Sequence, residues 1–270
     1  MSGQDKPLCL HFNQDHGKET IVFLHALLAS FVEYANVIQA LPDHHLMLVN
    51  LPRHSQSSKV PLFELGSAAK IVAELIEKQA QDGRAHLVGL SMGGFVALEI
   101  AKCCPELVSS VFVTGAVPLD GWRRWLAERP LMLYMEYGLA SFIQYCPDWL
   151  YWQVCSWLGL QRHDELRHET CKNFNLDLLR QGYAAILSFT VEDMKSIRAR
   201  TLIVAASALD NVDTTQSMGR LLKAKNVESK AAVVRGLVHA WNLRFPELFS
   251  KTIMAWVGGC DLPEGLEELV

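Results

Sequence analysis

Gly89-Leu90-Ser91-Met92-Gly93-Gly94 is the stretch of this sequence that decides the fold. It matches the pattern G-x-S-x-G, with the apolar run 85–90 (AHLVGL) before it and the helical pattern 95–103 (FVALEIAKC) after it. In that context a serine is predicted to occupy a sharp, strained turn between a strand and a helix, with its hydroxyl exposed. Glycines on both sides remove the Cβ clashes of so tight a turn. Ser91 is therefore our candidate nucleophile.

Short apolar runs alternate with helical patterns on both sides of this turn. The apolar runs are 20–24 (TIVFL), 45–50 (HLMLVN), 85–90, 109–114 (SSVFVT), 201–206 (TLIVAA) and 229–234 (SKAAVV), and 8–13 is a candidate edge strand. The helical patterns are 30–41, 65–79, 95–103, 215–223 and 246–257. This alternation predicts an α/β fold, with a mostly parallel sheet covered by helices on both faces. Ligands bind such sheets at the carboxyl ends of the strands, and the candidate catalytic residues all follow strands.

The stretch 118–190 differs in composition from the rest of the chain. It holds five of the seven Trp and five of the six Tyr, shows helical spacing and contains no convincing strand. A structureless loop of that length is improbable inside a compact domain. We predict that 118–190 forms a helical cap (lid) subdomain, and that 1–117 and 191–270 form the core. Trp122 and Trp125 are expected to line an apolar pocket, although such aromatic residues also serve as the core of a small subdomain.

Composition and charge exclude several classes of protein. The formal net charge is −4 and no basic stripe occurs, which argues against a nucleic-acid partner. The first twenty residues have no apolar signal-peptide core, and no apolar stretch is long enough to span a bilayer, so we expect a cytoplasmic protein without stable membrane anchoring. The seven cysteines form no C-x-x-C pair and the histidines no H-E-x-x-H pattern, so we expect no metal and no cofactor. The sequence does not indicate the oligomeric state.

The GLSMGG turn, the strand that ends in His25 and the segment around His239 (VHAWN) together resemble the α/β-hydrolase superfamily. The resemblance is to its cap-bearing branch of small esterases, lactonases, C–C hydrolases and thioesterases. It runs from about residue 20 to residue 257 and is absent in 118–190. It implies an α/β-hydrolase fold in which a serine nucleophile, an acid and a histidine base follow one another in the chain.

The same resemblance assigns the base and the acid. His239 follows the run 229–234 and precedes the last helix, where the family carries its base, and a serine hydroxyl is a weak nucleophile without one. Asp210 follows the run 201–206, the family's usual position for the acid. Two alternatives remain open: Asp120, which follows the run 109–114, and Asp213, which would otherwise cap the next helix.

Two backbone amides are expected to form the oxyanion hole. One belongs to Met92, directly after the nucleophile. The other belongs to Leu27, the third residue of His25-Ala26-Leu27, where the family has His-Gly-x. If the second position needs a positive φ, alanine would strain the loop. The segment 50–57 (NLPRHSQS) resembles a family loop of structural role, and we interpret it as structural.

The expected substrate is a largely apolar ester, lactone or thioester, cleaved through an acyl-enzyme without a cofactor. His25, Ala26 and Trp241 are expected to line its pocket, because they adjoin the oxyanion loop and the base. The resemblance also suggests a place in a specialised-metabolite (polyketide) pathway. Two other functions remain open, since a fold does not fix a function. One is a non-hydrolytic enzyme such as a cyclase, C–C lyase or condensation catalyst, and the other is a receptor-like ligand-binding module.

Overall fold

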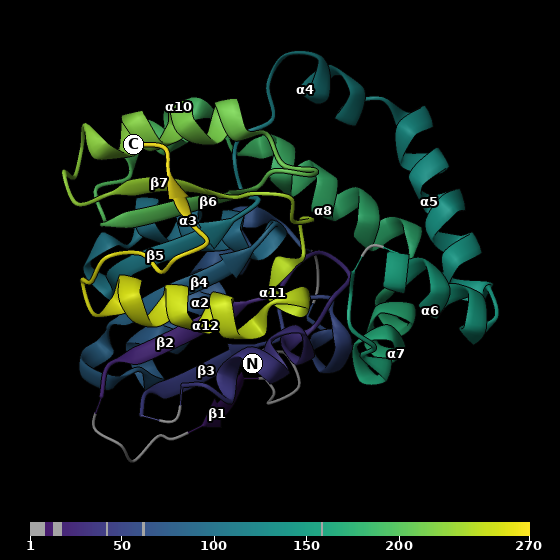
Figure 1. Cartoon of the computed structure of the whole chain (residues 1–270), viewed down its shortest axis with the longest axis horizontal. Helices are drawn as coiled ribbons and strands as arrows, with labels where there is room; N and C mark the ends of the chain where they lie inside the picture. Colours follow the sequence, from purple (N-terminus) through teal and green to yellow (C-terminus); the bar gives the residue numbers. More distant parts are fainter. Residues whose placement is uncertain (1–8, 13–17, 42, 61–62, 158) are drawn as a thin grey trace.

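The computed structural model describes residues 9–12, 18–41, 43–60, 63–157 and 159–270. Its described strands form one sheet in the order β1-β3-β2-β4-β5-β6-β7-β8 (Figure 1). The six parallel strands are β2 (Thr20–Leu24), β3 (His45–Val49), β4 (Ala85–Leu90), β5 (Val108–Thr114), β6 (Thr201–Ala206) and β7 (Lys230–Val234). β1 (Cys9–Phe12) and β8 (Glu267–Glu268) pair antiparallel at the two edges.

Helices cover both faces of this sheet, which explains why its central strands are continuous apolar runs. One face carries α2 (Leu65–Gln79), α3 (Met92–Cys103), α9 (Val191–Ser196) and α10 (Val212–Lys223), and the other carries α1 (Ala35–Ile38), α11 (Trp241–Arg244) and α12 (Pro246–Val257). Successive residues of β2 face opposite ways. Val22 and Leu24 join the core beside α3, whereas Ile21 and Phe23 join the core beside α12.

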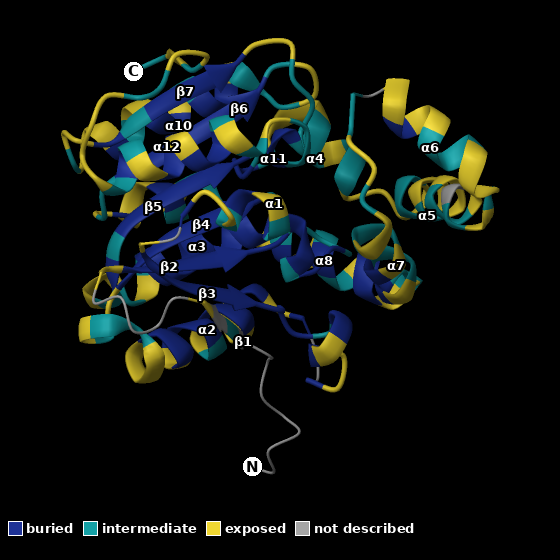
Figure 2. Ribbon diagram, turned by 60° about the horizontal axis from the view of Figure 1, so that its bottom comes forward, coloured by how far each residue is buried: buried dark blue, intermediate teal, exposed yellow. Residues whose placement is uncertain are grey.

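Five helices are inserted between β5 and α9, and we call α4–α8 the helical insertion. They are α4 (Gly121–Ala127), α5 (Pro130–Tyr145), α6 (Asp148–Trp157), α7 (Asp164–Asn173) and α8 (Leu176–Ser188). The insertion lies beside the sheet, with α7 and α8 nearer to it than α5 and α6 (Figure 1). Figure 2 shows the contrast in burial, since the strands are buried while α5 and α6 are largely exposed or intermediate. Within its described residues, the insertion contains helices and no strand.

Three local predictions need correction. The helix expected at 30–41 is a 3-10 turn, Phe31–Tyr34, followed by the four-residue α1, because Tyr34 (φ −102°, ψ 4°) lies outside the helical region. Helix α3 begins at Met92, three residues earlier than its pattern suggested. The acidic segment 261–270 is no simple tail, because β8 pairs with β7 and two ion pairs, Arg235–Glu267 and Lys230–Glu268, hold it there. Among the helices of the described chain, none has the length and hydropathy to span a bilayer.

Candidate active site

Ser91 stands on the turn between β4 and α3, in a strained backbone conformation. Its φ of 53° and ψ of −119° lie in a region that residues with a side chain rarely adopt. Its N–H donates to the Thr114 carbonyl at 2.9 Å, which ties the turn to β5. Helix α3 passes so close to β2 that a Cβ at Gly93 would lie 2.0 Å from the Leu24 carbonyl oxygen. The turn therefore requires glycine there, and it places Ser91 at the positive end of the α3 dipole.

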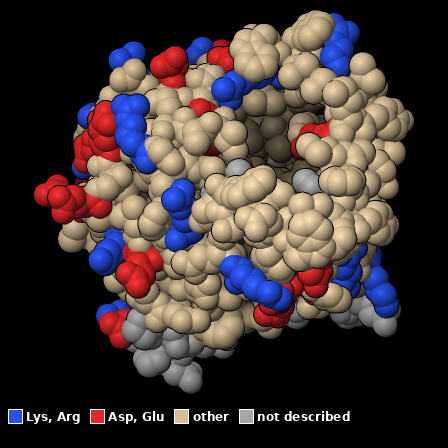
Figure 3. Space-filling model, turned by 45° about the vertical axis from the view of Figure 1, so that its right-hand side comes forward, with Lys and Arg blue, Asp and Glu red and all other residues tan. Residues whose placement is uncertain are grey.

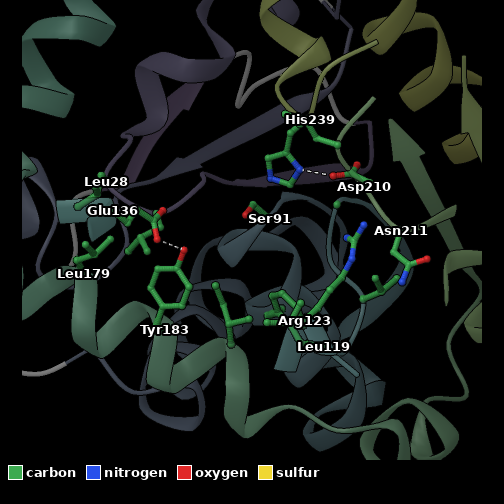
Figure 4. Close-up of a pocket in the computed structure, with 16 residues that line it drawn as sticks. Leu28, Ser91, Leu119, Arg123, Glu136, Leu179, Tyr183, Asp210, Asn211 and His239 are labelled. Atoms are coloured by element: carbon green, nitrogen blue, oxygen red, sulfur yellow. Dashed lines mark hydrogen bonds and ion pairs between the residues drawn. The ribbon is translucent and has the colours of Figure 1, made fainter. Parts of the chain in front are cut away.

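His239 and Asp210 meet at the carboxyl edge of the sheet, after β7 and β6. The His239 Nδ1 lies 2.6 Å from the Asp210 Oδ1, and the Asp210 Oδ2 accepts from the Ala206 N–H at 2.8 Å. Both carboxylate oxygens are thus engaged, which fixes the carboxylate and makes Nδ1 the protonated ring nitrogen. Figure 4 shows the His239 ring between Asp210 and Ser91. Ser91 makes no hydrogen bond to this ring among the described residues, and such contacts often tighten only when substrate binds.

The two alternative acids lie elsewhere. Asp120 is exposed, and its Oδ2 is 3.4 Å from the Thr214 hydroxyl. Asp213 is exposed in the first turn of α10, whose N-cap is Asn211. Of the three candidates in the described chain, Asp210 alone contacts His239. The geometry therefore favours Asp210 as the acid.

A second carboxyl group near His239 could not be inferred from the motifs. Glu33 is 5 % exposed, and its Oε2 accepts from the Ala26 N–H at 3.0 Å. Burial raises the pKa of Glu33 to about 7, against the opposing effects of the Ala26 amide and His239. Burial by itself would lower the pKa of His239, but the hydrogen bond and charge of Asp210, with the charge of Glu33, raise it above its ordinary value. The site thus stabilises an imidazolium.

Gly115, directly after β5, shapes the space that the His239 imidazole occupies. Its φ is +63°, and a Cβ there would lie 2.2 Å from the His239 Cε1. No non-glycine residue fits at this position without moving the imidazole. In the sequence, Gly115 is visible as a glycine directly after the apolar run 109–114, but no pattern there indicates a contact with His239.

The turn after β2, residues 26–29, leaves one amide free. The other three amides of this turn are engaged: Ala26 with Glu33 Oε2, Leu28 with His54 Nε2 at 3.2 Å, and Ala29 with the Ala26 carbonyl at 3.1 Å. Leu27 donates to no acceptor in the described chain, and neither does Met92, whose N–H opens α3. These are the two amides predicted for the oxyanion hole.

The strain expected at Ala26 is absent. The positive φ of this turn, 66°, falls on Leu28, and Ala26 lies outside that region. Alanine therefore replaces the family's glycine without a backbone penalty. Leu28 bears the left-handed conformation instead, at the third position of a turn closed by the Ala29–Ala26 hydrogen bond.

Two adjoining cavities lie between the sheet edge and the helical insertion. The first, of about 460 Å³, is lined by Ser91, Asp210 and His239 together with Leu27 and apolar side chains of α3 and α8. The second, of about 780 Å³, is bounded by α4 and α5. Five residues line both cavities: Leu119, Arg123, Glu136, Tyr183 and Leu209. A hollow with mostly uncharged walls is visible in Figure 3 on the side that carries the insertion.

The structure does not bring all the predicted pocket residues into these cavities. Trp122 lines the second cavity, but Trp125 is exposed and lines neither. Trp241 is fully buried in the core, where its Nε1 donates to the Thr114 hydroxyl. His25 is also buried, with one ring nitrogen bonded to the Ala26 carbonyl and the other accepting from the Leu51 amide. Neither His25 nor Ala26 is in the cavity lining, so their place is structural support of the turn.

Among the described residues, no three His, Cys, Asp or Glu side chains gather as a metal site. The charged groups that line the first cavity are Asp210, Glu136 and Arg123, beside His239. Glu136 accepts a hydrogen bond from the Tyr183 hydroxyl (Figure 4). Arg123 makes no ion pair within the described chain, and its guanidinium lies 5.6 Å from the Trp122 ring.

Comparison with known proteins finds similarity to hydrolases over most of the chain. The sequence profile described as "Alpha/beta hydrolase family" matches residues 21–252. An "AB hydrolase superfamily protein" of Gibberella zeae is 28 % identical over 93 % of this chain and 84 % of its own length. A "Pimeloyl-[acyl-carrier protein] methyl ester esterase" of Proteus mirabilis is 25 % identical over 88 % of this chain and 92 % of its own. A solved alpha/beta hydrolase from a deep-sea metagenome library superposes with a TM-score of 0.73 at 18 % identity, over 95 % and 96 % of the two chains.

Proposed function

This chain belongs to the alpha/beta hydrolase family, and we propose that it is a serine hydrolase that cleaves apolar esters, lactones or thioesters. The observation that carries the proposal is the Asp210–His239 pair, 2.6 Å between Nδ1 and Oδ1, in one cavity with a serine on a strained turn. A side-chain trio of this kind is typical of acyl transfer through a covalent intermediate. We further propose that the helical insertion acts as a cap over that cavity.

The first half of the proposed reaction is acylation. The Ser91 Oγ attacks the substrate carbonyl carbon while the His239 Nε2 accepts the hydroxyl proton. Asp210 holds the ring in the tautomer that leaves Nε2 free and stabilises the imidazolium that forms. The free amides of Leu27 and Met92 donate to the oxygen that becomes negative, and the N-terminus of α3 adds to this stabilisation. The tetrahedral intermediate then collapses as His239 gives its proton to the leaving alkoxide or thiolate.

The second half is deacylation. A water molecule replaces the leaving group, and the His239 Nε2 removes one of its protons as the water oxygen attacks the acyl carbon. The same two amides stabilise the second oxyanion, and collapse of this intermediate releases the acid and returns the proton to Ser91. Every proton transfer in the cycle passes through a single imidazole. Its pKa, raised by Asp210 and Glu33, therefore sets the lower pH limit of activity.

The cavity walls support an apolar substrate of medium size. Together the two adjoining cavities are lined mainly by Leu, Met, Ile, Val and aromatic side chains, as ligand sites usually are. The first cavity contains Ser91 and the second continues from it toward α4 and α5. This arrangement suits an acyl or alcohol chain that extends from the reacting carbonyl into the second cavity. The Proteus mirabilis relative is a pimeloyl-[acyl-carrier protein] methyl ester esterase, and a methyl ester falls within the proposed class. Thioesters of a specialised-metabolite pathway are part of the same proposal.

The proposed nucleophile is tested by intact-protein mass spectrometry after exposure to a fluorophosphonate. We expect one adduct on the parent protein and none on Ser91→Ala. Folding of both proteins is checked by circular dichroism. A well-folded parent without an adduct would remove the support for an activated serine.

A separate measurement distinguishes hydrolysis from non-hydrolytic chemistry at the same site. Esters and thioesters of increasing chain length are incubated in water enriched in oxygen-18. We expect one labelled oxygen in the released acid, and only with Ser91 present. Conversion of a substrate to an isomer without label would favour a cyclase or lyase instead, and slow turnover with tight ligand binding would favour a receptor-like module.

A further inference from the structure

Asn173, the last residue of α7, contacts two loops of the core. Its side chain is 4 % exposed. Its Nδ2 donates to the carbonyl oxygens of Leu28 and Ala29 at 3.1 and 2.7 Å. Its Oδ1 accepts from the Ser55 N–H at 2.6 Å, and the Ser55 hydroxyl lies 3.1 Å from Nδ2. One buried amide thus joins the helical insertion to the turn 26–29 and to the loop that contains Ser55.

Both loops need such support, because each contains a residue in the left-handed region. Leu28 has a φ of 66° and Ser55 a φ of 48°, and neither is glycine. Such conformations persist only where surrounding contacts determine them. Asn173 bonds the carbonyl of Leu28 and the amide of Ser55, so it directly contacts a left-handed residue of each loop. The second left-handed residue of the Ser55 loop, Arg53 with a φ of 70°, pairs with Asp177.

The turn 26–29 is also the one that presents the free Leu27 amide. The Leu27 N–H shares a peptide plane with the Ala26 carbonyl, which accepts from the Ala29 N–H at 3.1 Å. The Ala29 N–H in turn shares its plane with the Leu28 carbonyl, which Asn173 holds. We propose that Asn173 is a positioning residue, through which the docked insertion aligns the Leu27 N–H with the reacting oxygen. This inference rests on the proposed function, since it assigns a partner to the oxyanion hole of the same site.

Gly182 of α8 packs on the Leu27 side chain, but two polar contacts between the insertion and the core avoid this turn. Gln181 of α8 accepts from the Phe63 N–H at 2.8 Å, and Asp177 pairs with Arg53 at 2.9 Å. Neither Gln181 nor Asp177 bonds to residues 26–29 among the described contacts. Gln181→Ala is therefore a matched control, because it weakens docking of the insertion while the hydrogen bonds of the turn stay intact.

The test compares Asn173→Ala, Asn173→Asp and Gln181→Ala with the parent, on an ester whose hydrolysis depends on Ser91. Asn173→Asp retains an acceptor for Ser55 but loses the donor to Leu28 and Ala29. We expect both Asn173 variants to lose about 10- to 100-fold in kcat with KM within threefold, because misplacement by about 1 Å costs up to ~10². Gln181→Ala is expected to stay within twofold. Asn173→Asp with parental kcat, or an equal loss in Gln181→Ala, would overturn the inference.

A readout that does not depend on turnover keeps the two proposals apart. Hydrogen exchange of the peptide that covers residues 25–30, followed by mass spectrometry, reports the order of the turn itself. We expect faster exchange in both Asn173 variants than in Gln181→Ala, at thermal midpoints within a few degrees of the parent. If the parent lacks Ser91-dependent labelling, the proposed function fails while the exchange result still decides on Asn173. Unchanged exchange in the Asn173 variants would refute the proposal that Asn173 orders the turn 26–29.

Discussion

The carboxyl edge of the sheet and helices α4 and α5 line the same pair of cavities, but they are held in place by different kinds of contact. At the edge, directional hydrogen bonds hold His239, Asp210 and the turn 26–29. Helices α4 and α5 contribute apolar side chains to the second cavity and leave other large ones exposed, such as Phe142 at 64 %. Directional bonds fix single atoms, whereas apolar contact follows area and tolerates replacement. We therefore expect the edge to determine the reaction and α4 and α5 to determine the substrate.

The largest effect should come from the acid. Asp210→Asn retains the shape of the side chain but favours the wrong imidazole tautomer, and we expect kcat to fall by ~10⁴, as in other triads. KM should change little for short and long esters alike. Steady-state kinetics on both substrates gives the measurement, with folding checked by thermal melting. Activity within tenfold of the parent would reject Asp210 as the acid.

Gly115→Ala should be next. The added methyl group would lie 2.2 Å from the His239 Cε1, so the imidazole must move, and we expect a loss of about 10²-fold in kcat. Gly138→Ala in α5 is the matched control, because a Cβ there meets no atom within 4 Å and should leave kcat unchanged. A fully active Gly115→Ala enzyme would show that His239 tolerates displacement, which would contradict the expectation that the sheet edge requires precise positions.

Changes in α4 and α5 should be smaller and should depend on the substrate. Trp122→Ala removes part of the wall of the second cavity, and we expect KM for a long-chain ester to rise about tenfold while that for an acetate is unchanged. Trp157→Ala, similarly exposed but outside both cavities, serves as the control and should alter neither. An equal loss on acetate would mean that α4 also positions the catalytic groups.

The smallest effect concerns pH. The base must be neutral to accept a proton, and its pKa is raised, so kcat/KM should increase with pH through a value above that of an ordinary histidine. Glu33→Gln keeps an acceptor for the Ala26 amide but removes a carboxylate that favours the imidazolium. The variant should therefore lower the pKa of His239 and move the rise of kcat/KM to lower pH. A pH profile of both proteins measures the shift. A rise that stays in place would show that Glu33 has no electrostatic influence on His239.

The pattern of the sequence predicted those parts of the fold that depend on local periodicity and on one motif. The parallel sheet and the turn at Ser91 follow from apolar runs and from glycines at fixed spacing, whereas His239 and Asp210 were assigned by resemblance to the α/β-hydrolase superfamily. The roles of Gly115, Glu33 and Asn173 could not be inferred, because each acts on residues distant in the chain. Trp241 was placed in the pocket by adjacency to His239, yet successive residues of a loop can point into the core and into the cavity. The residues of 118–190 that line the two cavities belong to no sequence motif.

The short strand β8 has a consequence for the behaviour of the protein in solution. It occupies the outer hydrogen-bonding groups of β7, and its two glutamates are paired with Arg235 and Lys230. An uncovered sheet edge is a template for strand addition by another molecule, and charged residues there discourage it. Deleting residues 261–270 would leave the catalytic groups in place and open that edge to intermolecular pairing. A truncated enzyme should thus be active when dilute and prone to aggregate when concentrated.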